Sequence, residues 1–579
     1  MHRPRPHYRP MLVHYLRPQR LRVGLLAVLL ISSIILQLVN PQILRAFIDT
    51  VAGPHTGSAL TGIALLFLGL AIAQQALSVG ATFVGEQLAW TATNALRTDL
   101  TLHCLRLDLA FHKARTPGEL IERIDGDVTA MANFFSQFVI RVLGSLLLLV
   151  GILAVLLSIN GPAGLALSVC ALVTLAVMVS LRALAVPHWR AARQASADLF
   201  GFLEERLGGT VDIRASGAQP YVLRRLYTYL RERLRTGRRA RLIGGIGWSV
   251  PSVAAALCQA LAFALGAWLY QGGASLGTAF LVYFYTQLMF QPLDLIAHQI
   301  DDFQKASAGL GRVEELLHTT SVLIDGPGAP FPPGPLPVEF DQVAFGYEDA
   351  AVLRDLTLCL APGEVIGLLG RTGSGKTTLT RLLLRLYDPT AGTIRLGGVD
   401  LRAAHLRDLR RQIGVVTQDV QLFRATVRDN LTFFDPRIGD ARIMAALEEL
   451  GLAEWCRHLR AGLDTMLGAH GGGLSAGESQ LLAFTRIFLQ DPGLVILDEA
   501  SSRVDPATER LIERAVTRLL RNRTGIIIAH QLATVARADT ILILDGGAVA
   551  EYGPRATLAA DPGSRFAALL RTGAAEVLA

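Results

Sequence analysis

The chain has 579 residues, of which 51% are hydrophobic, and its mean hydropathy is +0.40. It is too long for a single core and too apolar for an ordinary cytosolic enzyme, so we expect part of it to lie in a membrane. The net charge of +7 could suggest a nucleic-acid partner, but no aromatic-basic recognition motif accompanies it, and membrane orientation explains it better.

The N-terminal segment is basic. Met1–Arg22 contains six arginines and no acidic residue. It also lacks the small-residue cleavage site of a removable signal peptide, which indicates a cytoplasmic N-terminus.

Six apolar segments in the first half have the length of a membrane-spanning helix, about 20 residues. They are Leu21–Phe47, Leu60–Phe83, Phe138–Ile159, Gly164–Val186, Ile246–Tyr270 and Leu276–Ile296.

The loops support this topology. Val51–Ser58, Asn160–Ala163 and Gln271–Ser275 contain no Lys, Arg, Asp or Glu and are predicted to lie outside. The long loops Gly85–Gln137 and Pro187–Gly245 are rich in arginine and are predicted to lie inside. Their apolar residues recur at helical spacing, which favours helices that continue into the cytoplasm, although a solvated helical face would give the same pattern.

The five cysteines are far apart in the sequence. Their number is odd and their spacing fits neither a metal site nor a C-x-x-C pair, so we expect reduced structural thiols. They are Cys104, Cys170, Cys258, Cys359 and Cys456.

A segment dense in proline and glycine, Gly326–Pro337, is predicted to be a linker because it cannot form a regular helix or strand. Beyond it, strand-like runs alternate with helical patterns, which is typical of an α/β domain. The predicted strands are Val338–Phe340, Val365–Leu369, Ile413–Thr417, Leu494–Leu497, Gly525–Ala529 and Thr540–Leu544.

Gly370–Thr378 reads GRTGSGKTT and fits the phosphate-loop pattern G-x-x-x-x-G-K-[ST]. Its glycines allow backbone N–H groups to converge on phosphate oxygens. Lys376 would neutralise the β/γ charge, and the Thr377 hydroxyl could bind Mg²⁺. A chance glycine turn is the alternative, but the order of strand, loop and helix argues against it.

The run Leu494–Glu499 is an apolar strand that ends in two acids. Two buried carboxylates need a charged neighbour, and Mg²⁺–ATP would supply one. Asp498 would then order the metal through its waters, and Glu499 would act as general base. The alternative is a purely structural role, in which one acid caps the N-terminus of a helix and the other lies in its first turn.

Leu474-Ser475-Ala476-Gly477-Glu478 resembles the Leu-Ser-Gly-Gly-Gln signature of ATP-binding-cassette transporters. With the motifs above, the chain resembles a half-transporter of the type IV exporter architecture over nearly its whole length. The resemblance implies a multidomain membrane protein. Residues 1–325 would form an all-α six-helix transmembrane bundle, followed by the linker 326–337. Residues 338–579 would form an α/β P-loop ATPase domain with a helical subdomain. The protein would lie in a bacterial inner or cell membrane, with the ATPase domain in the cytoplasm.

The resemblance also implies roles for single residues. Tyr347 would stack on adenine, Gln418 would touch Mg²⁺ and the attacking water, Asp505 would lie between subunits, and His530 would bond the γ-phosphate. Ser475 and Gly477 would face the γ-phosphate in the partner's site, and short coupling helices are expected at Leu107–His112 and Thr210–Ala215. The expected nucleotide-binding set is Tyr347, Gly370, Arg371, Thr372, Gly373, Ser374, Gly375, Lys376, Thr377, Thr378, Gln418, Asp498, Ser475, Gly477 and Glu478; the catalytic set is Glu499, His530 and Gln418, and the metal set is Thr377, Gln418 and Asp498.

Three positions depart from the family pattern. Ala476 and Glu478 replace Gly and Gln, and Ala469 stands where exporters commonly have Glu. Because these departures fall on surfaces expected to face another subunit, they favour a paired half-transporter whose partner lacks the catalytic glutamate, with a homodimer as the alternative.

The function implied is ATP-driven export of an amphipathic, lipid-like or peptide-like substrate. An importer on the same fold, as in siderophore uptake, and an ATP-gated channel or regulator remain alternatives. The spans hold few polar groups; some could line a cargo cavity, and helix-packing amides are the alternative. They include Gln37, Asn40, Gln42, Gln74, Gln75, Arg141, Gln259, Gln287 and Gln291.

Overall fold

The computed structural model describes residues 13–53, 57–348, 350–417, 420–468, 474–498, 506–529 and 534–572. The chain divides into two compact units. The first contains residues 1–106 and 115–320, and the second contains residues 107–114 and 321–579. The short segment 107–114 therefore belongs with the C-terminal unit, although it lies far from it in sequence.

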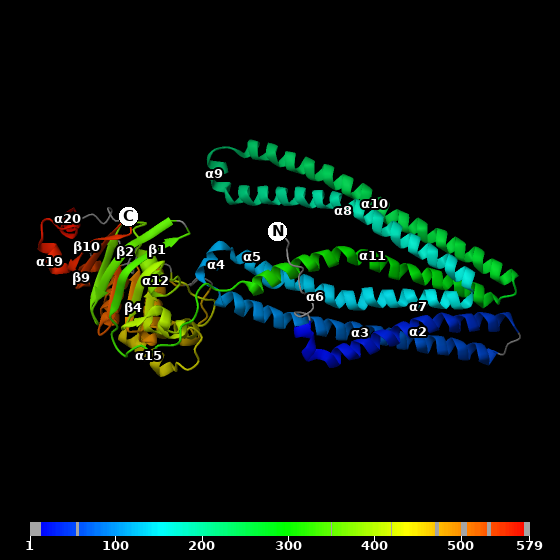
Figure 1. Ribbon diagram of the computed structural model, residues 1–579, viewed down its shortest axis with the longest axis horizontal. Coiled ribbons are helices and arrows are strands. Elements are labelled where there is room, and N and C mark those ends of the chain that lie inside the picture. The colour runs from blue at the N-terminus through cyan, green and yellow to red at the C-terminus, as the bar shows by residue number, and fades with distance from the viewer. Residues whose placement is uncertain are drawn as a thin grey trace. The chain divides into compact units, whose positions relative to one another are not determined.

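Long helices dominate the first unit (Figure 1). Five helices of the described chain are long and apolar enough to cross a membrane. They contain four of the first five predicted spans in full and, of the third, residues 141–159. The sixth predicted span forms the first part of α11, which is not one of these five helices. The long helices are α2 (Arg20–Ala52), α3 (Gly57–Arg106), α7 (Gly144–Ile159), α8 (Gly161–Gly208), α10 (Gln219–Gln271) and α11 (Leu276–His318).

Short helical segments complete this unit. They are η1 (Arg17–Gln19), α5 (Pro117–Ile121), η2 (Glu122–Asp127), α6 (Val128–Gln137), η3 (Phe138–Leu143) and α9 (Thr210–Ala215).

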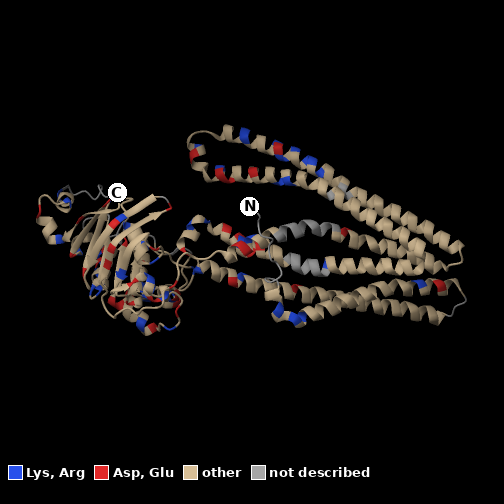
Figure 2. Cartoon of the chain, viewed as in Figure 1, with Lys and Arg blue, Asp and Glu red and all other residues tan. Residues whose placement is uncertain are grey.

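The three longest helices, α3, α8 and α10, extend far beyond a bilayer. The shortest has 48 residues, about 72 Å at 1.5 Å per residue against a hydrocarbon core of about 30 Å. The charged residues of α8 and α10 gather toward α9, while the opposite halves of these helices are nearly free of charged residues (Figure 2). This distribution fits the prediction that these helices continue into the cytoplasm.

Side-chain caps begin the helices that follow two of the predicted outer loops. Asn160 Oδ1 accepts from Ala163 N at 3.0 Å before α8, and Ser275 Oγ accepts from Thr278 N at 3.2 Å before α11. Asp49 then ties the end of α2 to the start of α11, because it accepts from Ser275 Oγ and Gly277 N, both at 2.8 Å.

The expectation of five reduced cysteines is wrong for two of them. Cys170 on α8 and Cys258 on α10 form a disulfide, with their Cα atoms 6.4 Å apart. They lie 88 residues apart in sequence and meet because α8 and α10 pack side by side. Cys104, Cys359 and Cys456 are free thiols.

Two sheets form the second unit. One has the order β10-β9-β3-β8-β7-β6, in which β9, β3, β8, β7 and β6 run parallel and β10 is antiparallel to β9. The other is antiparallel, with the order β2-β1-β4-β5. The strands are β1 (Val338–Tyr347), β2 (Ala350–Leu360), β3 (Val365–Gly370), β4 (Ala391–Leu396), β5 (Val399–Asp400), β6 (Ile413–Val416), β7 (Leu494–Asp498), β8 (Thr524–Ile528), β9 (Thr540–Asp545) and β10 (Ala548–Pro554).

The parallel sheet is buried on both faces, as its uninterrupted apolar runs predict. Successive residues of a strand point to opposite faces. On β7, Val495 and Leu497 pack with the helices on one side, while Leu494 and Ile496 pack with the antiparallel sheet and α12 on the other. The helices of this unit are α4 (Leu109–Ala114), α12 (Lys376–Leu383), α13 (Leu406–Gln412), α14 (Val427–Thr432), α15 (Asp440–Glu449), α16 (Ala453–His458), α17 (Ala476–Gln490), α18 (Pro506–Leu520), α19 (Arg555–Ala560) and α20 (Arg565–Thr572), with the 3₁₀ segments η4 (Leu401–Ala403), η5 (Gly462–Asp464) and η7 (Thr534–Arg537).

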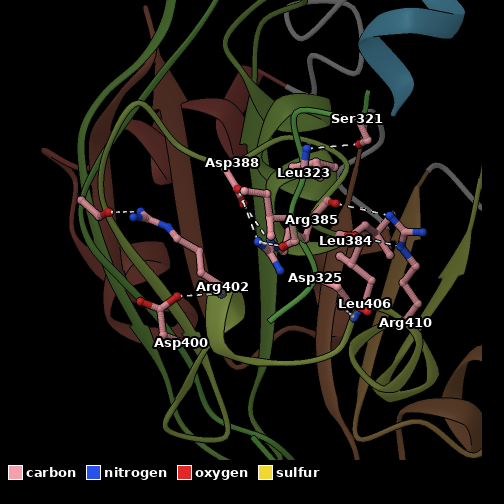
Figure 3. Close-up of polar contacts among 12 residues, drawn as sticks. Ser321, Leu323, Asp325, Leu384, Arg385, Asp388, Asp400, Arg402, Leu406 and Arg410 are labelled. Carbon is pink, nitrogen blue, oxygen red and sulfur yellow. Dashed lines mark hydrogen bonds and ion pairs between the residues drawn. The ribbon is translucent and has the colours of Figure 1, made fainter. Parts of the chain in front are cut away.

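The chain has no helix or strand between 319 and 337, a stretch that ends with the predicted linker, and side chains just before the linker are anchored to the rest of the second unit (Figure 3). Asp325 Oδ1 accepts from Leu406 N at 2.7 Å, and this bond lowers the pKa of Asp325. Arg385 Nη2 donates to Ile324 O at 2.8 Å, while its Nε donates to Asp388 Oδ1 at 2.9 Å. Burial and the neighbouring Arg385 lower the pKa of Arg410, which donates to two backbone carbonyls beside this site.

Candidate functional site: a nucleotide site at one edge of the parallel sheet

Four neighbouring parallel strands bring the predicted catalytic elements to one edge. In the order β3, β8, β7, β6, their carboxyl ends lead into the phosphate loop, His530, Asp498 with Glu499, and Gln418. Ligands of open α/β sheets bind outside the carboxyl ends of the strands. The strand order therefore brings together motifs that are up to 160 residues apart.

Three of these residues, Gln418, Glu499 and His530, lie outside the described residues, as do Ala469 and Asp505. Their roles stay predictions. The strands that precede Gln418, Glu499 and His530 are described, and each ends at the same edge.

The phosphate loop joins β3 to α12. Gly370, Gly373 and Gly375 have φ of +150°, +83° and +106°, values that favour glycine. A Cβ at Gly370 would also collide with Leu544 O, and one at Gly375 would lie 2.6 Å from Leu353 Cδ2. Glycine is therefore required at both ends of the loop.

Lys376 begins α12 and is buried, 7% exposed. Its Nζ donates to Gly370 O at 2.5 Å and to Arg371 O at 3.1 Å, so the ammonium group is held inside the curve of the loop. Ser374 Oγ is buried and has no hydrogen-bond partner among the described residues. A buried cation beside an orphaned hydroxyl fits the phosphates of a nucleotide.

The predicted adenine-stacking residue is held against the loop's helix. Tyr347 Oη receives a hydrogen bond from Arg381 Nη1 at 3.0 Å and lies 3.3 Å from Thr378 Oγ1, and both partners are on α12. Lys113 Nζ on α4 stands 4.7 Å from the centroid of the Tyr347 ring, a cation–π contact that the sequence analysis missed. α4 is the predicted first coupling helix and belongs to the second unit. The contact between Lys113 and Tyr347 therefore links this helix to the nucleotide site.

That coupling helix was predicted at Leu107–His112 and is observed at Leu109–Ala114, while α9 has the predicted bounds Thr210–Ala215. The shift arises at Asp108, whose Oδ1 accepts from Phe111 N at 2.9 Å and so starts the helix after it.

The signature segment forms the start of α17. Ser475 Oγ accepts from Glu478 N at 3.2 Å, and Glu478 Oε2 accepts from Ser475 N at 2.7 Å, which makes a capping box. Trp455 Nε1 donates to Glu478 Oε1 at 2.8 Å. Both carboxylate oxygens of Glu478 are thus bonded within the chain; its predicted nucleotide contact stays a prediction, as do those of Ser475 and the buried Gly477.

Arg486 fixes α17 to the segment that follows the predicted lid glutamine. Its Nε donates to Asn430 O at 2.6 Å and its Nη1 donates to Gln421 O at 2.9 Å. Burial lowers the pKa of Arg486 to about 10, still far above neutral, so the group remains charged. Sequence reasoning missed this arginine because its partners are 56 and 65 residues away.

The residues present fit Mg²⁺ in part. No cluster of three or more His, Cys, Asp or Glu side chains of the described chain could hold a metal by itself. That is expected for Mg²⁺, which is typically bound by one or two protein groups, waters and phosphates. Thr377, which is exposed in the first turn of α12, and Asp498 at the end of β7 would supply those protein groups.

Comparisons with known proteins agree with this arrangement. Residues 23–293 match the family described as ABC transporter transmembrane region, and residues 353–502 match the family described as ABC transporter. A fatty acid ABC transporter ATP-binding/permease protein of Mycobacterium bovis is 33% identical over 81% of this chain and 74% of its own length. The ATP-dependent lipid A-core flippase 1 of Colwellia psychrerythraea is 29% identical over 82% of each chain.

Among solved structures, a bacterial Atm1-family ABC exporter with ATP bound superimposes with a TM-score of 0.79 at 25% identity, over 96% of this chain and 99% of that one. Three findings support the same family: the transmembrane helices, the fused ATPase domain and the agreement in fold over nearly the whole length. The chain belongs to the ABC transporter family and is a half-transporter with the type IV exporter fold, embedded in the membrane with its ATPase domain in the cytoplasm.

Proposed function

We propose that this exporter moves an amphipathic, lipid-like or peptide-like substrate across the membrane, with ATP hydrolysed at the carboxyl edge of the parallel sheet. ATP hydrolysis coupled to transport follows from the family. The observation that supports the proposal for the site is the order β3-β8-β7-β6, because the carboxyl ends of these neighbouring parallel strands precede the four predicted catalytic segments in the sequence.

In the proposed reaction Lys376 holds the β/γ-phosphates, and the N–H groups of the loop and of the first turn of α12 surround them. Glu499 accepts a proton from the attacking water, and His530 bonds the γ-phosphate. Mg²⁺, held by Thr377, Asp498 and Gln418, would neutralise developing phosphate charge. Tyr347 would stack on adenine.

The cargo class is supported by two relatives. One is named a fatty acid ABC transporter and the other an ATP-dependent lipid A-core flippase, and both fatty acids and lipid A are amphipathic. The long apolar helices with a few polar side chains in the first unit suit such molecules better than ions.

Half-transporters of this family typically function as dimers. We propose that Ser475 and Gly477 of one chain complete the nucleotide site of a second chain, and that the second chain is a different half-transporter whose own catalytic glutamate is missing. The departures at Ala469, Ala476 and Glu478 motivate this pairing.

Reconstitution tests the transport proposal. Inside-out proteoliposomes should accumulate a lipid-like substrate only with ATP, and the same substrate should stimulate ATP hydrolysis; Glu499→Gln should abolish both. Uptake only in right-side-out vesicles would indicate import instead, and ATP-gated ion conductance without accumulation would indicate a channel.

The dimer is tested separately by weighing the detergent-solubilised complex. The chain expressed alone should fail to give a stable dimer with cargo-stimulated ATPase activity. A stable, cargo-responsive dimer of identical chains would refute the paired arrangement and leave the transport proposal intact.

A further inference from the structure

A polar cavity of about 380 Å³ lies within the helical unit. Four segments form its walls: α2, α3, the stretch from η3 into α7, and α11. Its lining includes four glutamines, three serines and one arginine: Gln37, Gln74, Gln75, Gln291, Ser33, Ser78, Ser145 and Arg141.

These polar groups lie at similar distances from the outer ends of their helices. Gln37, Gln74, Arg141 and Gln291 each lie roughly 15 to 18 residues along their helices from the outer end, about 22 to 27 Å at 1.5 Å per residue. All four lie within predicted membrane-spanning segments, where polar groups are costly unless they serve a function. Sequence reasoning left open whether such residues line a cavity; the structure brings five of the nine polar residues it named to this one.

The described residues that line the cavity carry a positive charge and no negative charge. Arg141 is the only charged group among the described lining residues, and its side chain is exposed. An arginine within a predicted membrane span, with amide and hydroxyl donors around it, favours a ligand that carries a compensating negative charge. Its planar guanidinium can bind a carboxylate or a phosphate with two parallel hydrogen bonds.

The remaining wall is apolar. Leu30, Ile34, Leu148 and Leu295 line the same cavity. The volume is at the small end of the range for ligand pockets, about 300–1,000 Å³, so it suits one headgroup and the first part of a chain.

We propose that this cavity binds the single anionic headgroup of a single-chain amphiphile, a carboxylate or a phosphate monoester, with Arg141 as its counter-ion and the start of the alkyl chain against the leucines and Ile34. The inference rests on the proposed export function and narrows its cargo to anionic lipids. A neutral or cationic amphiphile would leave the arginine uncompensated.

Native mass spectrometry of the detergent-solubilised full chain tests this directly. Laurate and dodecyl phosphate separate the two headgroup chemistries, and dodecanol has the same chain without the charge. At least one anion should bind about tenfold or more tightly than dodecanol, and Arg141→Gln should remove that difference, whereas Arg141→Lys should keep part of it.

A matched control is Arg45→Gln. Arg45 of α2 is, like Arg141, an arginine within a predicted membrane span, but it lies outside the cavity and pairs with Asp49 at 3.6 Å. This variant should bind the anions as the unmodified chain does.

A second variant tests the cavity independently, in case Arg141→Gln fails to fold. A Cβ at Gly144 would meet Leu30 Cδ1 at an ordinary 3.6 Å, so Gly144→Ala should be accommodated and should narrow the cavity while Arg141 remains. Anion binding should fall in this variant too.

Anion binding that survives both changes, or dodecanol binding as tight as that of both anions, would overturn the inference; in that case Arg141 only reaches toward bulk lipid headgroups. Failure of the proposed function has a different signature. In that case the anions would bind in an Arg141-dependent manner, but no substrate would accumulate in vesicles with ATP.

Discussion

At the scale of single residues, the nucleotide site separates groups that hold the nucleotide from the group expected to react. Lys376 is buried and bonded to two carbonyls of the phosphate loop, which restricts the ammonium group before any ligand arrives. The general base is assigned to Glu499, which directly follows the last residue of β7.

The Glu499→Gln variant should therefore keep ATP affinity and lose turnover by about a hundredfold or more, because an amide cannot accept the proton of the attacking water. Lys376→Ala should instead weaken nucleotide binding. Steady-state ATPase assays and equilibrium binding of a fluorescent ATP analogue separate the two effects.

Glu509→Gln is the control, since this glutamate of α18 is exposed. It should change turnover by no more than about twofold, as surface changes usually do. Near-normal turnover of Glu499→Gln would remove Glu499 from its role.

Glu478 has a structural part that the family comparison alone does not indicate. It accepts two hydrogen bonds, from Ser475 N and Trp455 Nε1, so Glu478→Ala should lower the local free energy of unfolding of the first turn of α17 by about 2 kcal/mol. Glu478→Gln keeps one accepting oxygen and should cost about half as much. Hydrogen exchange of the α17 amides measures both, and protection equal to that of the unmodified chain would contradict the capping role.

At the scale of elements, one carboxylate connects the start of α4 to the chain just before the linker. Asp108 Oδ2 accepts from Val322 N at 2.8 Å and from Ser321 Oγ at 3.3 Å, while Oδ1 accepts from Phe111 N. Burial alone would raise the pKa of Asp108, but these hydrogen bonds outweigh it and lower the pKa.

Because the folded-state pKa lies below the ordinary value of about 4, the carboxylate stabilises α4 fully above that pH. The stabilisation should be lost as the pH falls through the lowered pKa. Asp108→Asn should remove it at all pH values, seen as faster hydrogen exchange of residues 109–114 at pH 7. Asp355→Asn, at an exposed position with φ +49° that asparagine tolerates, should have no such effect. Unchanged exchange in Asp108→Asn would contradict this anchoring.

The disulfide between Cys170 and Cys258 joins α8 to α10. If a protease site is inserted after Gly217, between α9 and α10, the two fragments should stay together on a non-reducing gel once free thiols are alkylated. Reductant should separate them, and Cys258→Ser should separate them without reductant. Separation of the unmodified pair without reductant would show that the cysteines are not bonded.

At the scale of the whole molecule, orientation follows from arginine-rich loops on one side and charge-free loops on the other. Cysteines at Asn160 or Ser275 should react with an impermeant thiol reagent on intact cells, and one at Ala218 should not. Losing the Asn160 or Ser275 cap costs about 1 kcal/mol, which a fold of this size should tolerate. The reverse labelling pattern would overturn the orientation.

The sequence alone determined what depends on short segments. The phosphate loop, the acidic strand and the signature each lie within about ten residues, and apolar runs of span length reveal membrane helices without knowledge of their neighbours. Five of the six predicted strands were found because buried parallel strands are continuous apolar runs. The sixth covers only the first three residues of the antiparallel β1, and β2, β4, β5 and β10, whose burial alternates or is partial, were missed. The capping box at Ser475 and Glu478 was visible in the spacing S-x-x-E and was not used.

Only the tertiary structure decided what depends on contacts between distant segments. Cys170 meets Cys258, Trp455 reaches Glu478, Lys113 covers Tyr347, and four helices bring Arg141 to a set of glutamines. Helical and strand periodicity states which face of an element is apolar, but not which other element packs against it or in what register. The pairing of elements is set by packing across the whole unit, and it decides both the disulfide and the cavity.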